Sequence, residues 1–221
     1  GTFARSIGWA PSSSRCTAPT TAEPPDANGL GTWFGGSEYW YGHHLYAPGT
    51  GVQEMLKYLP SQNPNQPTTA PYLKTGYRWV TQGQWFFSCL PSMASGNGHS
   101  GQAFLAVDPN GNRYRFDWMV AYPAQPLIKA AGMPPMRGGP DTPMPNDSES
   151  PRPLLPGTGL LERDDIWIYP TEIKDRFGNT VTFTWSGNKL MQISATDGRT
   201  ITLTYDNNVI HSATDGSRTW I

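Results

Sequence analysis

The chain has 221 residues, with 16 basic against 17 acidic side chains, so it has no charge excess suited to nucleic acid or to an anionic membrane surface. Glycine (24) and proline (22) make up about a fifth of the residues, against a usual share nearer an eighth. No apolar run approaches the roughly 20 residues of a membrane span, and the first residues lack the pattern of a signal peptide.

The aromatic content indicates strands. Nine Trp, ten Tyr and eight Phe suit strands and exposed aromatic surfaces better than helices, and the abundant glycine and proline indicate many turns. We therefore predict an all-β protein, a twisted antiparallel sheet of hairpin repeats with long Pro/Gly-rich loops and very little helix. The length allows one large all-β domain or two smaller ones.

The N-terminal half predicts irregular structure followed by short strands. Proline, serine and threonine dominate residues 1–32, which predicts an irregular segment. Residues 33–120 are rich in aromatic side chains and strand patterns. Within them, 51–59 is the only stretch where a helical turn is plausible, and a strand pair is expected over 77–80 and 84–90.

The clearest hairpin pattern spans residues 104–120. Its Asp-Pro-Asn-Gly turn at 108–111 combines a proline that fixes φ with a glycine that tolerates positive φ. On the return limb Tyr114, Phe116 and Trp118 alternate with charged residues, which predicts that the three rings share one face.

A proline-rich segment separates this hairpin from a series of repeats. Residues 121–165 carry ten prolines between Pro123 and Pro156 and predict a long surface loop or an insertion. From residue 166 to residue 221, β-branched strands alternate with aspartate–glycine turns in the manner of β-hairpin repeats.

One phrase recurs in these repeats. Asp-Arg-Phe-Gly-Asn is followed by Thr-Val-Thr-Phe-Thr-Trp at 175–185, Asp-Gly-Arg by Thr-Ile-Thr-Leu-Thr-Tyr at 197–205, and Asp-Gly-Ser-Arg opens a third copy at 215. The turn glycines are 20 and then 18 residues apart, and such a unit is too small to bury its own apolar face. The predicted turn residues, including those of the upstream hairpin, are Asp108, Gly111, Asp175, Gly178, Asp197, Gly198, Asp215 and Gly216.

Residues with catalytic or metal-binding potential do not form a known motif. His43 and His44 are adjacent, so on a strand they would point to opposite faces and could not chelate one metal well. Neither an HExxH motif nor a G-x-S-x-G elbow occurs. The sequence therefore predicts no catalytic residues, no cofactor and no metal site, and it favours a protein without enzymatic activity while leaving an enzyme open.

Two further groups of residues have a structural and a functional interpretation. A cluster of rings could stack against sugars or form a packing layer, and the packing layer is favoured; its members are Trp33, Tyr39, Trp40, Tyr41 and Tyr46. Cys16 and Cys89 are 73 residues apart, a spacing that fits neither a zinc site nor a redox motif. We predict a disulfide between them if the protein is exported, with two buried thiols as the alternative.

The tail resembles the YD-repeat (RHS-repeat) family of bacterial proteins. The residues that carry the resemblance are 175–185, 190–206 and 215–220, and the hairpin at 108–117 looks like another such unit. Residues 39–56 are similar to the segment that precedes the repeats in large RHS proteins. The family's self-cleavage signature, Asp-Pro-x-Gly-Leu, is not carried over, because Asn112 replaces the leucine.

The resemblance implies a sheet that spirals into a hollow shell around a C-terminal cargo, often a toxin, exported to the cell surface or secreted. Expected partners are further repeats of the same or a partner chain along the C-terminal edge, and a polypeptide cargo; neither nucleic acid nor a membrane span is expected. With two full repeats and no cargo, the chain fits either a piece of such a shell or a short stand-alone member. The alternative function is an exported carbohydrate-binding or carbohydrate-active protein that uses the ring cluster at 33–46 to bind a glycan.

Overall fold

The protein is all-β wherever its structure is described. The computed structural model describes residues 3–8, 43–58, 65, 67–71, 76–98, 103–129 and 159–221. Every regular element in these ranges is a β-strand, and all strand pairs are antiparallel, which confirms the predicted fold class. No helix in these ranges is long and apolar enough to cross a membrane.

Within the described residues, fourteen strands build one branched sheet. The first part contains β1 (Phe3–Gly8), β2 (His43–Ala47), β3 (Gly51–Glu54), β4 (Leu56–Lys57), β5 (Trp79–Val80), β6 (Phe86–Leu90), β7 (Ala103–Val107), β8 (Arg113–Lys129) and β9 (Gly159–Lys174). The second part contains β10 (Thr180–Ser186), β11 (Lys189–Ala195), β12 (Thr200–Asp206), β13 (Val209–Thr214) and β14 (Thr219–Trp220).

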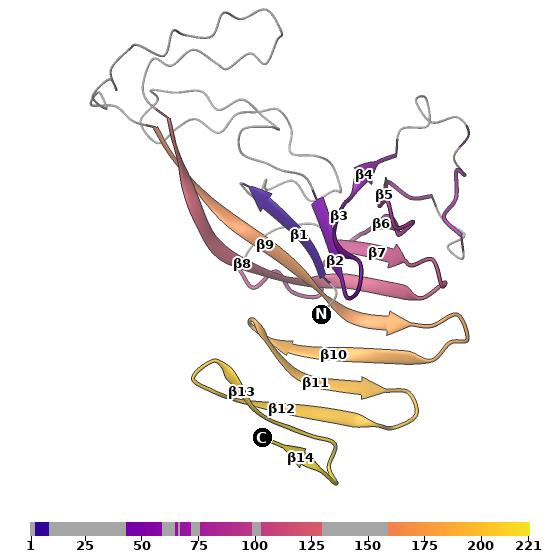
Figure 1. Ribbon diagram of the computed structural model, residues 1–221, viewed down its shortest axis with the longest axis vertical. Helices are drawn as coiled ribbons and strands as arrows, with labels where there is room; N and C mark the ends of the chain where they lie inside the picture. The colour runs from indigo at the N-terminus through magenta and orange to yellow at the C-terminus, as the bar shows by residue number, and fades with distance from the viewer. Residues whose placement is uncertain are drawn as a thin grey trace, which may run out of the picture.

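Strands β1 to β9 close on themselves into a ring. From β9 the pairing runs through β1 and β2 to β3 on one side, and through β8, β7, β6 and β5 to β4 on the other. Met55 alone separates β3 from β4, and its amide donates to the His43 carbonyl oxygen on β2 at 2.9 Å. β3 ends one branch of the pairing and β4 ends the other, so their direct connection closes the ring (Figure 1).

The inside of the ring holds the main hydrophobic core. Phe87, Phe104 and Phe116 are fully buried there, and Phe104 packs edge-on against Phe87 with ring centroids 6.2 Å apart. Burial of each such side chain contributes roughly 2–3 kcal/mol. The other buried members are Leu45, Ala47, Met55, Trp79, Trp85, Ala106, Met119, Ile166 and Ile168.

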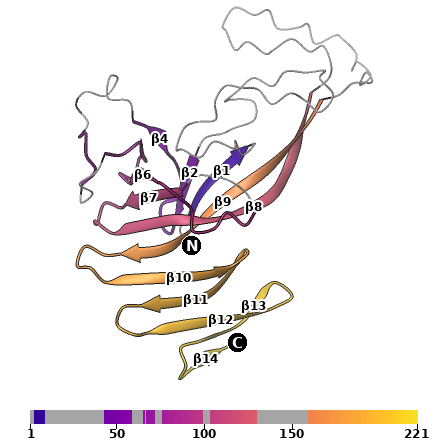
Figure 2. The same ribbon diagram turned by 180° about the vertical axis from the view of Figure 1, so that it is seen from behind.

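Strand β9 is the branch point of the sheet. One edge of β9 pairs with β8, whereas the other edge is divided between β1, at residues 164–168, and β10, at residues 172–174. From β10 the strands follow one another in chain order to β14 and form an open sheet beside the ring (Figures 1 and 2).

The open sheet has one apolar and one polar face. Val181 lies opposite Ala195, and Phe183 opposite Ile193, which in turn lies opposite Ile201. The alternate positions carry mostly threonine and serine; those of β12 and β13 include Thr204 and Ser212, whose hydroxyls are 2.7 Å apart. The period of two in the repeat phrase therefore sorts the side chains as predicted.

The prediction of a helical turn within 51–59 is wrong. Residues Gly51–Glu54 and Leu56–Lys57 are strands β3 and β4. Gly49 and Gly51 have φ of 80° and 69°, and the tight turn they form returns the chain beside β2. Pairing with β2 therefore decides the local conformation, because its ladder satisfies backbone groups that a single helical turn would leave open.

The predicted shared face of Tyr114, Phe116 and Trp118 is only partly correct. Tyr114 and Phe116 stack with ring centroids 6.0 Å apart, but the β8–β9 register shifts between Phe116 and Trp118. The extra residue of this bulge is Asp117, and it reverses the alternation so that Met119, not Trp118, is fully buried. A bulge of this kind leaves no mark in a hydrophobicity pattern.

Strands extend into two segments for which the sequence predicts loops. β1 lies within residues 1–32, and β8 and β9 reach Lys129 and Gly159 within the proline-rich segment 121–165. Strand β1 is built from Phe-Ala-Arg-Ser-Ile-Gly and has partners on both edges, β2 and β9, that lie far away in the sequence. Long-range pairing of this kind overrides a weak local preference.

Asp117 joins the neighbouring strands β8 and β9 of the ring through a buried polar contact. Its side chain is 1% exposed, and its carboxylate accepts hydrogen bonds from Arg115 Nε and from Thr171 Oγ1, both at 2.5 Å. The backbone carbonyl of Asp117 also accepts from the amide of Ala94 at 3.0 Å.

We predict that Asp117→Ala destabilises the protein by about 2–3 kcal/mol, because Arg115 and Thr171 would lose the charged acceptor they share. Urea denaturation followed by tryptophan fluorescence measures the change. Asp206→Ala, at an exposed strand end, is the control and should change the free energy of unfolding by less than about 0.5 kcal/mol. Equal effects of the two substitutions would contradict the assigned role of Asp117.

Candidate functional site

The candidate site is the row of turns at one end of the strands, together with the apolar face of the open sheet. Four predicted turns connect β7 to β8, β9 to β10, β11 to β12 and β13 to β14. Because they are alternate connections in a meander, they all lie on the same side of the sheet (Figure 1). Their aspartates are Asp108, Asp175, Asp197 and Asp215.

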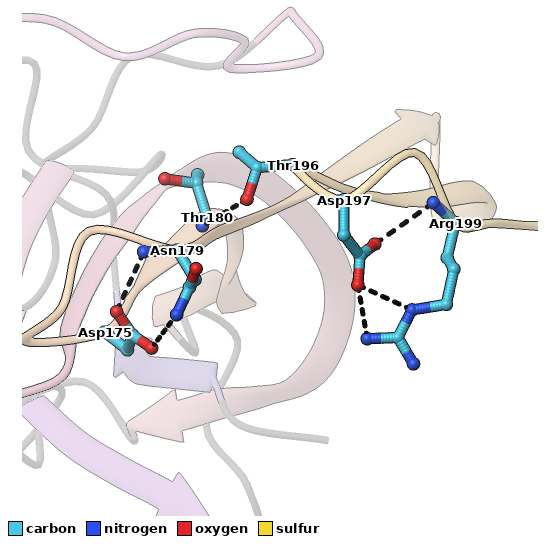
Figure 3. Close-up of polar contacts among 6 residues, drawn as sticks. All are labelled: Asp175, Asn179, Thr180, Thr196, Asp197 and Arg199. Carbon is cyan, nitrogen blue, oxygen red and sulfur yellow. Dashed lines mark hydrogen bonds and ion pairs between the residues drawn. The ribbon is translucent and has the colours of Figure 1, made fainter.

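The turn at 175–179 is closed by its own aspartate. Asp175 Oδ1 accepts hydrogen bonds from the amides of Phe177 and Asn179, both at 2.8 Å, and Oδ2 accepts from Asn179 Nδ2 at 2.7 Å. Gly178 has φ of 99°, a conformation that favours glycine. Figure 3 shows the carboxylate directed at Asn179 and therefore back into its own turn.

The upstream turn at 108–112 has the same construction. Asp108 Oδ1 accepts from the amides of Asn110 at 2.9 Å and Asn112 at 2.8 Å, and Oδ2 accepts from Asn112 Nδ2 at 2.8 Å. Tyr114 donates its hydroxyl to Asp108 Oδ2 at 3.2 Å; burial, and next the Asp108 charge, raise the pKa of Tyr114 to about 12. The hairpin at 104–120 and the first tail repeat therefore share one turn geometry.

The last two turns use shorter variants of this device. Asp197 Oδ1 accepts from the amide of Arg199 at 3.1 Å, and Oδ2 contacts Arg199 Nε at 2.7 Å and Nη2 at 2.5 Å (Figure 3). Asp215 Oδ1 accepts from the amides of Ser217 at 2.9 Å and Arg218 at 2.7 Å. Each aspartate thus satisfies backbone amides that the turn leaves without a strand partner.

In the last three turns these hydrogen bonds favour the charged form of the aspartate. The Asn179 side chain lowers the pKa of Asp175, the Arg199 side chain lowers that of Asp197, and the Arg218 amide lowers that of Asp215. In return, Asp197 raises the pKa of Arg199. A carboxyl group with a lowered pKa is a poor general acid or base near neutral pH, so the row is suited to structure rather than to proton transfer.

The second and third turns are joined to each other. Thr196 donates its amide to the Thr180 carbonyl oxygen at 3.0 Å, and the Thr180 amide donates to Thr196 Oγ1 at 3.2 Å. Figure 3 shows this contact between the turn at Asp175 and the turn at Asp197. The second and third turns are therefore linked, and the link holds their two hairpins in register.

Aromatic side chains hold the opposite ends of the repeat strands. β10 pairs with β9 for three residues, 180–182, and β12 pairs with β11 only at 200–202. Beyond these pairs Trp185 Nε1 donates to the Pro170 carbonyl oxygen at 2.9 Å, and the Tyr205 hydroxyl donates to that of Leu190 at 2.9 Å. In each bond the donor and the acceptor are 15 residues apart in the sequence. The aromatic residue that ends each Thr-x-Thr-x-Thr phrase therefore connects two strands beyond the point where their backbone pairing stops.

Sequence reasoning found this phrase but missed the role of its last residue. The signal was available, because an aromatic residue with a polar ring atom, Trp185 or Tyr205, ends each full copy. The separation of the strands is a tertiary feature, and without it the ring donor has no evident acceptor.

The apolar face of the open sheet carries a groove. The groove has a volume of about 600 Å³; its apolar lining is Val181, Ile193, Ala195, Ile201 and Trp220, and residues 198–200, 215 and 217 complete the lining. Trp220 is 52% exposed, on the last strand in the sheet order. This surface can receive apolar side chains of another polypeptide.

The predicted ring cluster lies mostly outside the described residues. Trp33, Tyr39, Trp40 and Tyr41 are not described. Tyr46 is half-buried on β2, directly opposite Phe3 on β1 and Val52 on β3. The sugar-stacking interpretation therefore stays a prediction.

The structure describes both adjacent histidines but only one of the two cysteines. Cys89 is half-buried on β6, but Cys16 lies outside the described residues, so the pairing of Cys16 with Cys89 stays a prediction. His43 is buried between the rings of Trp79 and Phe104, whereas His44 is partly exposed, as expected for adjacent residues of a strand. In the part of the chain that is described, no three His, Cys, Asp or Glu side chains are grouped to hold a metal ion.

Comparison of the chain with protein-family models, with curated proteins and with solved structures found no match.

The turn carboxylates predict a dependence of stability on pH. Because folding lowers the pKa of three aspartates from the ordinary 3.8, their contribution is complete above that value and is lost as the pH falls through the folded pKa. We expect the amides of Phe177, Asn179 and Arg218 to lose hydrogen-exchange protection as the pH falls below the ordinary aspartate pKa of 3.8.

Replacing the three aspartates with asparagine should remove much of this dependence, because asparagine keeps an acceptor oxygen and does not titrate. Core amides of Phe104 and Phe116, measured in the same experiment, are the internal reference. Turn amides of the unmodified protein whose protection does not fall with pH, relative to the core amides, would contradict the prediction.

The hydrogen bond of Tyr205 predicts that loss of its hydroxyl destabilises the protein. Tyr205→Phe should lower the free energy of unfolding by about 1 kcal/mol, because the Leu190 carbonyl loses its donor. Tyr58→Phe removes a hydroxyl outside the repeat sheet and should change stability by less than about 0.5 kcal/mol. Thermal unfolding of both variants measures the difference, and an unchanged Tyr205→Phe variant would show that the contact does not stabilise the hairpin.

Proposed function

We propose that this protein is a structural segment of an RHS-type β-shell, which encloses or presents a polypeptide cargo such as a toxin. The observation that carries the proposal is the open sheet of β10 to β14, whose hairpins repeat one turn, one aromatic contact and one apolar face. The resemblance of the tail to the YD-repeat family also implies a secreted or surface location, which is part of the proposal.

The division of the protein into a ring and an open sheet supports this role. The ring buries its own core, so it can anchor the end of a long sheet. The repeat strands instead leave apolar side chains partly exposed, with Val209 at 69%, Ile210 at 54% and Trp220 at 52%. A repeat unit gains stability mainly from its neighbours, so a surface of this kind favours addition of the next unit.

The proposed mechanism is addition of strands along the sheet. A further strand pairs with β14, its turn extends the row of aspartate turns, and its apolar side chains continue the face that bears the groove. The apolar face then lines the space that holds the cargo, and the threonine-rich face is directed away from it.

A hairpin peptide tests whether the β14 edge accepts a strand of the repeat type. We expect a synthetic peptide with the sequence of residues 197–214, which form β12 and β13, to shift the amide resonances of Thr219 and Trp220 in a saturable manner. The same peptide with Thr200→Pro and Thr202→Pro lacks two amide donors and should not bind.

Paired lysine variants locate the binding surface. Trp220→Lys with Ile221→Lys should abolish binding of the peptide, because charge on an edge strand opposes pairing. Val52→Lys with Leu56→Lys adds the same charge to exposed apolar residues of the ring, away from β14, and should leave binding intact. The proposal fails if the peptide leaves the β14 resonances unchanged, or if the proline peptide binds equally well.

A further inference from the structure

One aromatic side chain of the row of turns is largely exposed. Phe177, in the turn at 175–179, has 78% of its surface open to solvent. The same place in the turn at 108–112 carries a polar residue, Asn110. In the view of Figure 1 the turn between β9 and β10 extends farther out than the turns that follow it. A ring in this position does not contribute to the core and is suited to insertion into an apolar site elsewhere.

A cation accompanies this ring. The Arg176 guanidinium lies 4.8 Å from the centroid of the Phe177 ring. Among the described residues, no carboxylate forms an ion pair with Arg176. The tip of the turn therefore presents an apolar ring and a positive charge next to each other.

The groove on the open sheet has the space for such a ring. Its volume of about 600 Å³ is enclosed in part by the apolar side chains named above, from Val181 to Trp220. An apolar cavity of about 150 Å³ is enough to hold benzene, so a phenylalanine side chain fits into the groove. Phe177 of the same copy does not fill it, because that ring is exposed.

The lining of the groove also offers a negative charge. Asp215 Oδ1 accepts from the amides of Ser217 and Arg218 and from the Ser217 hydroxyl. In the described part of the chain, no donor is bonded to the second oxygen, Oδ2. Arg199, the other charged residue of the lining, is already paired with Asp197. The charge of the groove is therefore complementary to that of the turn tip.

We propose that the tip of the turn at 175–179 docks into the groove of a second copy of this protein. Phe177 enters the apolar space, and Arg176 pairs with Asp215 Oδ2 of the second copy. Both halves of the contact lie at the same end of the open sheet, since Phe177 precedes Val181 of the groove by four residues. A two-fold axis beside β10 thus lets each copy insert its own turn tip into the other.

The size of the contact predicts a weak dimer. Each inserted ring buries roughly 150–250 Å², and the contact is made twice, so the interface is at the small end of the range for specific complexes. The inference goes beyond the proposed shell function and does not depend on it, because strands add at the β14 edge rather than at the turn tip.

Sedimentation velocity over a series of protein concentrations tests the dimer. The unmodified protein should pass from monomer to dimer as its concentration rises. Phe177→Asn copies the residue of the first turn and should weaken the dimer at least about 100-fold, because two rings lose their burial. Val209→Thr alters an apolar side chain of similar exposure, 69%, that does not line the groove, and it should leave the dimer unchanged.

A double-mutant cycle tests the ion pair between the copies. Arg176→Gln and Asp215→Asn should each weaken the dimer about five-fold, since the pair occurs twice. Asparagine keeps the acceptor oxygen that the turn uses. Because both substitutions remove the same contact, the variant that carries both should be no weaker than either single variant. Losses that multiply in the double variant would show that the two groups do not meet.

A mixture of isotope-labelled and unlabelled copies locates the contact. Nuclear Overhauser effects should connect the Phe177 ring of one copy with the methyl groups of Val181 or Ile193 of the other. A protein that stays monomeric throughout the concentration series would overturn the proposal and leave the groove to a cargo segment. Equal losses in Phe177→Asn and Val209→Thr would overturn it as well.

The test is separate from the test of strand addition. Binding of the hairpin peptide is measured at Thr219 and Trp220, and Phe177→Asn should leave that binding unchanged. A protein that binds the peptide and stays monomeric contradicts only the dimer, whereas a dimer that ignores the peptide contradicts only the proposed shell function.

Discussion

The division of one edge of β9 between β1 and β10 determines the architecture of this protein. Residues 164–168 pair with β1 and close the ring, whereas residues 172–174 pair with β10 and begin the open sheet. Thr171 lies between these two segments and donates to the buried carboxylate of Asp117. A strand has only two edges, so the ring and the repeats can coexist only because each takes a different part of β9.

The two parts bury their apolar residues by different means. In the ring, side chains such as Phe87, Phe104 and Phe116 point into an enclosed space and lose contact with water. In the open sheet, a single layer leaves one side of every apolar residue without cover, and Leu203 alone among its side chains is buried. The ring therefore covers its own apolar side chains, whereas the open sheet leaves its apolar side chains partly exposed.

The repeats replace packing with local polar contacts. The aspartates at 175, 197 and 215 bind amides of their own turns, and Trp185 and Tyr205 bind carbonyl groups of the preceding strands. Each contact lies within one hairpin or between two neighbours. The same contacts can thus be repeated along a sheet of any length, which is the property expected of a shell.

The sequence itself predicted what depends on local pattern. The alternation of apolar residues with threonine placed Val181 and Phe183 on one face, and the aspartate and glycine positions located all four turns, because both signals act within a few residues. The hairpin at 104–120 and the strand pair over 77–90 followed from the same rules.

Only the tertiary structure decided which distant segments meet. The ring depends on β1, which pairs with β2 (Phe3 opposite Tyr46) and with the distant β9 (Ala4 opposite Ile168), and no local pattern encodes such partners. The bulge at Asp117, the opposition of Arg113 and Lys174, and the acceptors of Trp185 and Tyr205 likewise depend on the register between strands. Register is set by the packing of whole strands, so it becomes visible only when the strands are assembled.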